Sequence, residues 1–144
     1  MPRMAEIVRL KSAEQNAAKE IGALLKQLDK EKSFSLQSLE VLVQSPSSEL
    51  WVAREGGAIV GMATLNFLQR VMGSVGYVDD VVVDVQHRGK GFGTKLLEAV
   101  IESARARGAE KLALTSRPSR EEANKLYQKL GFKLKETNSY RLEL

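Results

Sequence analysis

The order of structural elements is decided by residues 78–132, which read VDDVVVDVQHRGKGFGTKLLEAVIESARARGAEKLALTSRPSREEANKLYQKLGF. The stretch opens with β-branched residues, passes through a run with glycine at alternate positions, and continues with apolar residues at helical spacing. We therefore predict a central strand over residues 75–85, followed by a helix that begins near Gly91 and ends near Gly108.

Downstream of this helix the pattern predicts a strand, a helix and a closing pair of strands. The first strand covers residues 111–115, and Ser119 with Glu122 three residues later forms a capping-box pattern that opens the helix. Gly131 supplies a left-handed stop, and the aromatic residue after it can pack back on the helix. The closing strands are predicted over residues 132–136 and 139–144.

The residues before the central strand predict two amphipathic helices between strands. The fold class that follows is α/β (α+β), one domain over residues 1–144, with helices on the faces of a mixed, mostly antiparallel sheet. The complete order, β-α-α-β-β-β-α-β-α-β-β, indicates six to seven strands and about four helices. The upstream elements are a strand over residues 6–11, helices over 13–28 and 36–43, and strands over 50–55 and 59–68 around the Gly56-Gly57 turn.

Composition excludes several classes of protein. The 144 residues contain no cysteine, so disulfides, cysteine metal sites and a thiol nucleophile are excluded. No apolar run is long enough to span a membrane, and the charged N-terminus does not resemble a secretory signal, so we expect a cytoplasmic protein without a membrane partner. The net charge of +4 comes from Lys and Arg mixed with acids along the chain, which argues against a nucleic-acid partner.

Residues 88–94, RGKGFGT, form a glycine-rich turn between strand and helix. Glycine lets amides approach a ligand closely, and a helix N-terminus offers unpaired amides and a positive dipole end, so a phosphate group is the expected guest. A dinucleotide fingerprint would need glycine where Thr94 or Leu96 stands, and Gly93-Thr94-Lys95 does not match the order of a P-loop. The pattern [Gln/Arg]-x-x-Gly-x-[Gly/Ala] does fit, through Arg88, Gly91 and Gly93.

That pattern resembles the pyrophosphate loop of the GNAT superfamily of N-acetyltransferases. The strand before it and the downstream ANKLYQKLGF (residues 123–132) are also similar to the family, over roughly Leu50 to Phe132. The resemblance implies an acetyl-CoA-dependent N-acetyltransferase whose sheet splays between the fourth and fifth strands, with no metal. It places the co-substrate against Val81, Val82, Val83, Arg88, Gly89, Lys90, Gly91, Phe92, Gly93, Thr94, Asn124 and Tyr127.

The resemblance also implies roles in the chemistry. The backbone N–H of Val83 would donate to the thioester oxygen, and Tyr127 would protonate the departing thiolate. A buried aromatic at helical spacing is also a usual core residue, so a packing role for Tyr127 stays open. Many family members carry an asparagine where this chain has Arg120, which leaves the pantetheine contacts unassigned, although Asn124 lies one turn before Tyr127. Without cysteine, direct attack by the amine is the simpler mechanism.

The proton acceptor is expected at Asp79 or Asp80, or at ordered water. Successive strand residues face opposite ways, so one acid of the pair points into the cleft. The pair resembles the Glu-Asp of polyamine and glucosamine-phosphate acetyltransferases, which favours Asp79. Two neighbouring carboxylates raise one another's pKa and attract a cationic amine. A structural role, capping a loop or pairing with surface Lys, is the competing interpretation.

The sequence therefore predicts an enzyme that binds acetyl-CoA and a small cationic amine, and it is compatible with a homodimer. A protein or peptide amine as acceptor, a non-catalytic acyl-CoA-binding sensor, and a basic nucleic-acid-binding module are the alternatives. The only histidine, His87, has no further ligands spaced for a metal and is interpreted as a loop residue.

Overall fold

The computed structural model describes residues 5–144 and divides the chain into two units, Met1–Leu114 and Thr115–Leu144. The predicted single domain over residues 1–144 thus includes residues 1–4, which lie outside the described part. Within residues 5–144, no helix combines the length and the apolar character needed to cross a bilayer.

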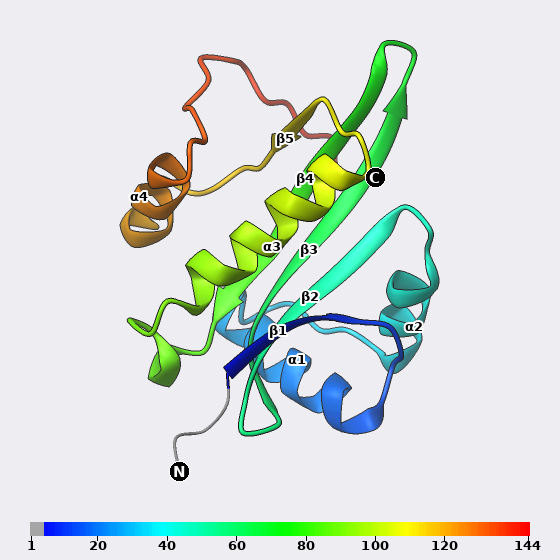
Figure 1. Ribbon diagram of the computed structural model, residues 1–144, viewed down its shortest axis with the longest axis vertical. Coiled ribbons are helices and arrows are strands. Elements are labelled where there is room, and N and C mark those ends of the chain that lie inside the picture. The colour runs from blue at the N-terminus through cyan, green and yellow to red at the C-terminus, as the bar shows by residue number, and fades with distance from the viewer. Residues whose placement is uncertain (1–4) are drawn as a thin grey trace. The chain divides into compact units, whose positions relative to one another are not determined.

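The first unit is built on one five-stranded sheet in the order β1-β2-β3-β4-β5 (Figure 1). Three pairings are antiparallel, and β4 pairs with β5 in parallel. The predicted mixed, mostly antiparallel sheet is confirmed in kind. The strands are β1 (Ala5–Leu10), β2 (Ser48–Glu55), β3 (Ala58–Arg70), β4 (Gly73–Val83) and β5 (Lys111–Ala113).

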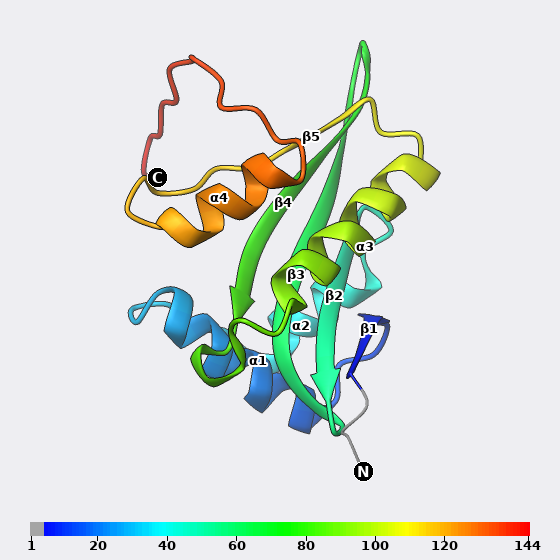
Figure 2. The same ribbon diagram turned by 60° about the vertical axis from the view of Figure 1, so that its left-hand side comes forward.

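Helices cover both faces of this sheet. The core on one face joins apolar residues of α1 (Gln15–Leu28) and α2 (Leu36–Gln44) to sheet residues such as Met62. On the other face, Leu96 of α3 (Phe92–Ala106) lies so close to Gly61 that a β-carbon there would be 3.1 Å from it. Gly61 and Met62 are successive strand residues and therefore face opposite ways. Figure 2 shows α3 lying along the β3–β4 hairpin.

The second unit holds α4 (Glu121–Lys129). Its C-terminal stop is confirmed: Gly131 has φ 103°, its N–H donates to the Gln128 carbonyl, and the Phe132 N–H donates to the Tyr127 carbonyl. The predicted capping box is wrong. The N-cap residue is Arg120, whose side chain makes no capping hydrogen bond. The Arg120 N–H closes a turn on the Arg117 carbonyl, and Ser119 lies one residue before the N-cap position that a capping box requires.

The prediction of six to seven strands is also wrong, because the described residues form five. Residues 132–144 alternate in polarity as a strand does, but they join no ladder within the described chain. Backbone groups of a strand need a partner, and alternation alone does not supply one. The apolar side chains of this segment are exposed instead: Leu134, Tyr140, Leu142 and Leu144.

Candidate functional site

The acidic pair lies at a bulge in β4. The β3–β4 register runs from Met62↔Val82 to Thr64↔Asp79, so two β4 residues oppose the single residue Ala63. Asp80 is one of the two and has φ 53°, a left-handed conformation that is uncommon outside glycine. The bulge breaks the simple alternation assumed from the sequence, which placed the two acids on opposite faces.

Both acids of the pair are bound from β3. The Thr64 hydroxyl donates to the Asp79 carbonyl at 2.9 Å and lies 3.2 Å from Asp80 Oδ2. The Asn66 side-chain amide donates to Asp79 Oδ2 at 3.2 Å. Thr64 is almost fully buried, so its contacts fix the bulge from beneath.

The two carboxylates have different electrostatic surroundings. Burial raises the pKa of Asp80, the Thr64 hydrogen bond lowers it, and the negative charge of Asp79 raises it further, so that the net pKa is above the usual value. Asp80 still remains accessible to solvent. Asp80 is therefore a candidate proton acceptor beside Asp79, the residue that the sequence favours.

β4 loses its pairing with β5 before the bulge and stays paired with β3 beyond it. β5 pairs with β4 only at Val75–Tyr77, as expected if the fourth and fifth strands diverge. The Asp84 N–H donates to the Val60 carbonyl at 2.8 Å, on the β3 side. Neighbouring amides along a strand point to opposite edges, so the Val83 N–H points to the β5 side, past the end of the β5 ladder.

The glycine turn leads from β4 into α3 with two residues in left-handed conformations, Gly89 at φ 82° and Gly91 at φ 84°. A β-carbon at either position would meet nothing within 4 Å, so backbone conformation, and not crowding, requires glycine here. Gly91 is the N-cap of α3 and offers no side-chain acceptor. Among residues 5–144, the amides of Phe92, Gly93 and Thr94 have no acceptor, and these groups point out of a helix N-terminus.

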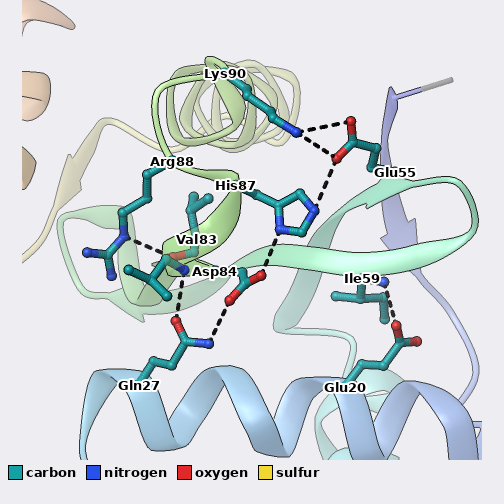
Figure 3. Close-up of polar contacts among 10 residues, drawn as sticks. Glu20, Gln27, Glu55, Ile59, Val83, Asp84, His87, Arg88 and Lys90 are labelled. Carbon is teal, nitrogen blue, oxygen red and sulfur yellow. Dashed lines mark hydrogen bonds and ion pairs between the residues drawn. The ribbon is translucent and has the colours of Figure 1, made fainter. Parts of the chain in front are cut away.

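The turn is braced by a chain of polar contacts that crosses three elements (Figure 3). Gln27 of α1 donates to Asp84 at 2.8 Å and accepts from the Val85 N–H at 3.0 Å. Asp84 Oδ2 lies 2.7 Å from His87 Nδ1, and His87 Nε2 lies 3.2 Å from Glu55 Oε2. Hydrogen bonds from Gln27 and His87 hold the pKa of Asp84 below its usual value.

The two basic residues of the turn are also held by the protein. Lys90 Nζ lies 3.3 Å from Glu55 Oε2, and Arg88 Nε donates to the Val83 carbonyl at 3.2 Å. Arg88 therefore ties the turn to the end of β4, and Lys90 ties it to the end of β2. The side chain of Phe92 is buried, so only its backbone amide faces the turn.

Sequence reasoning missed the brace. The sequence indicates only a loop residue at His87, yet His87 bridges Asp84 and Glu55, and no sequence pattern marks Gln27 as a partner of Asp84. Gln27 and Asp84 are 57 residues apart in sequence, and no local pattern marks such a pair. No cluster of three or more potential metal ligands occurs among the described residues.

The second unit carries the remaining predicted residues. Tyr127 is buried and its ring meets Phe132 edge to face, with centroids 6.0 Å apart. Burial raises the pKa of Tyr127, although the charge of Arg120 opposes this. Asn124 donates to the Arg117 carbonyl at 3.0 Å, which uses its side-chain amide N–H within this unit.

Comparison with known sequences gives one family. The model of the acetyltransferase (GNAT) family matches residues 16–132. A glucosamine 6-phosphate N-acetyltransferase 1 from Oryza sativa is 36% identical over 92 residues, which cover 64% of this chain and 52% of the relative. The corresponding enzyme from Trypanosoma brucei brucei is 38% identical over 91 residues, covering 61% of this chain and 59% of the relative. The chain thus spans about half the length of the curated relatives it matches.

Solved structures share the fold over nearly the whole chain. A Trypanosoma brucei acetyltransferase superposes with a TM-score of 0.80 at 30% identity, covering 98% of this chain and 100% of that one. An aminoglycoside N-acetyltransferase in complex with CoA superposes with a TM-score of 0.85 at 19% identity, covering 99% of this chain and 97% of that one. At that identity, the second likeness shows the fold alone.

Proposed function

Because the chain belongs to the acetyltransferase (GNAT) family, we propose that it transfers the acetyl group of acetyl-CoA to a small primary amine. The amine attacks the thioester directly in a ternary complex, since the chain has no cysteine to form an acyl-enzyme. The glucosamine 6-phosphate N-acetyltransferases among its relatives support a small acceptor. One domain, a homodimer and a cytoplasmic location stay predictions.

The observation that carries this proposal is the N-terminus of α3. Its amides from Phe92 to Thr94 have no acceptor within residues 5–144, and the turn before them adds Arg88 and Lys90. Backbone amides and the positive end of the helix dipole suit the diphosphate of acetyl-CoA. We propose that the backbone of residues 88–94 holds this diphosphate and that the brace keeps the turn in a binding conformation.

The acetyl group is proposed to lie along Val81–Val83. The Val83 N–H points to the β5 edge of β4, where β5 no longer pairs. There it can donate to the thioester oxygen, on which negative charge develops during attack. In this proposal the thioester carbonyl lies beside Val83, two residues after the bulge that carries the carboxylates.

We propose that Asp80 takes the proton from the attacking amine, directly or through water. An amine must lose a proton to become nucleophilic at neutral pH, and a carboxylate of raised pKa is a better acceptor than an ordinary one. Asp79, which Asn66 holds in place, adds the negative charge that attracts an ammonium group. Tyr127, whose hydroxyl carries its proton at neutral pH, is proposed to protonate the departing thiolate.

The test is acetyl-CoA consumption across a panel of primary amines, with the wild type, Asp79→Asn and Asp80→Asn. We expect turnover with at least one small amine, a large loss of kcat in Asp80→Asn, and a smaller loss in Asp79→Asn that lies mainly in the KM of the amine. Stabilisation by CoA without turnover on any small amine or peptide would replace the proposal with a binding-only function. Equal losses in both variants would remove the separate roles of the acids.

A further inference from the structure

A row of polar side chains runs along one face of the β3–β4 hairpin, away from the glycine turn. Directly opposite residues of an antiparallel pair share a face, and so do alternate residues of a strand. The register pairs Thr64 with Asp79 and Asn66 with Tyr77, and Arg70 is four residues beyond Asn66, past the apolar pair Leu68 and Val75 on the same face. This polar row consists of Thr64, Asn66, Arg70, Tyr77, Asp79 and Asp80.

The two ends of the polar row have opposite charge. At one end, Asp79 and Asp80 are bound by Asn66 and Thr64. At the other end, Arg70 Nη2 donates to the Tyr77 hydroxyl at 2.6 Å. The Arg70 side chain therefore reaches back from the end of the hairpin toward the acids.

Arg70 is oriented without being neutralised. No salt bridge joins it to an acid within residues 5–144. A guanidinium has five N–H donors, of which the contact with Tyr77 uses one. Because the Tyr77 hydroxyl accepts this bond, its own hydrogen remains available for a second acceptor. The pair thus offers several converging donors, which suit a phosphate or a carboxylate.

The spacing fits one small molecule that touches both ends. Tyr77 and Asp79 are two residues apart, which is about 7 Å along a strand, and the guanidinium is held 2.6 Å from the hydroxyl at the tip of the Tyr77 side chain. The anion-binding end is therefore on the order of 10 Å from the carboxylates. A second ammonium at that distance would meet the positive charge of Arg70.

We propose that Arg70, oriented by Tyr77, is a specificity-determining residue that binds an anionic group of the acceptor. The acceptor class is then a primary monoamine that carries a phosphate or carboxylate, with the amine directed to Asp79 and Asp80. This inference rests on the proposed acetyl transfer. It refines the acceptor from a cationic amine to a zwitterionic one, and it disfavours diamines.

The experiment compares amines that differ only by a phosphate: glucosamine with glucosamine 6-phosphate, and tyramine with its phosphate ester. Initial rates are measured for the wild type, Arg70→Gln, Arg70→Lys and the control Arg105→Gln, which removes an exposed arginine near the far end of α3. We expect the wild type to prefer a phosphorylated member, and Arg70→Gln to lower its kcat/KM about tenfold or more through KM. The unphosphorylated amine should be unaffected, Arg70→Lys should restore part of the preference, and Arg105→Gln should match the wild type.

The outcomes separate this inference from the proposed function. Turnover of simple amines with no preference for phosphate, or an equal loss for both members of a pair in Arg70→Gln, overturns the role of Arg70 and leaves acetyl transfer standing. If no amine is acetylated, acetyl transfer fails, and Arg70 is then tested by titrating inorganic phosphate. A phosphate-dependent stabilisation that is the same in the wild type and Arg70→Gln would refute the anion site.

Discussion

Replacing Glu49 with glutamine should destabilise the first unit, because this buried carboxylate joins β1, β2 and α3. Glu49 is 2% exposed and accepts hydrogen bonds from Ser103 (2.6 Å), Trp51 (2.9 Å) and Arg107 (3.0 Å). Arg9 adds an ion pair at 3.7 Å. Burial alone would raise the pKa of Glu49, but these bonds and the charge of Arg9 outweigh it and hold the pKa below its usual value.

The size of the effect follows from these contacts. A hydrogen bond to a buried charge contributes about 1.5–3 kcal/mol, and removing one partner of a buried ion pair costs about 3–5 kcal/mol. Glutamine keeps the shape and one acceptor, and both arginines are about one-third exposed, with side-chain values of 33% and 35%. We therefore expect about 3 kcal/mol of lost unfolding free energy, which lowers Tm by about 10 °C in a chain of this size.

The pH dependence gives the sharper test. A carboxylate whose folded pKa is lowered stabilises the fold above its unfolded pKa, and this stability is lost as pH falls through the folded pKa. The difference between wild type and Glu49→Gln, measured by urea unfolding, should be full at pH 7 and shrink below about pH 4. The exposed Glu102→Gln is the matched control. A difference that stays constant from pH 7 to pH 3, or is below about 1 kcal/mol at pH 7, would refute the electrostatic account.

Three further changes test the site. Gly91→Glu should abolish CoA binding, measured by calorimetry, because it strains a left-handed position and puts a negative charge at the glycine turn. The control Gly108→Glu, at φ 77° near the far end of α3, imposes similar backbone strain and should bind CoA normally. Tyr127→Phe should keep CoA affinity and lower kcat about 100-fold, and an unchanged kcat would remove its acid role. His87→Ala should raise the KM for acetyl-CoA about fivefold with little change in kcat, since it breaks the brace between Asp84 and Glu55; an unaltered KM would show that the turn needs no brace.

Local sequence signals predicted most of the fold because local physics decides those elements. The spacing of Leu96, Leu97 and Val100 predicted α3, and all three are buried. Gly56-Gly57 predicted the β2–β3 turn, where both residues have positive φ. The glycine turn was also correctly located between β4 and α3, since Gly89 and Gly91 adopt conformations that favour glycine; its role in binding phosphate stays a prediction.

The errors share a cause, which is dependence on residues distant in sequence. Residues 132–144 have the alternation of polar and apolar residues that is typical of a strand, but a strand also needs a neighbouring strand to accept and donate its backbone hydrogen bonds. The geometry of Asp79 and Asp80 depends on Thr64 and Asn66 of β3, which create and bind the bulge. The brace likewise depends on Gln27 and Glu55. None of these relations leaves a periodic or motif-like trace in one sequence.

In the proposed site, backbone groups of the glycine turn bind the co-substrate, whereas side chains of the polar row bind the acceptor. In the proposed function the glycine turn holds the co-substrate through backbone amides and left-handed glycines, so we expect substitutions there to disturb co-substrate binding. The polar row relies on exposed side chains such as Arg70 at the end of a hairpin, where substitution costs little stability. A change at Arg70 can therefore alter the acceptor while the turn and the core stay intact. Under these two proposals, the glycine pattern indicates the co-substrate, and the side chains of the β3–β4 hairpin indicate the acceptor.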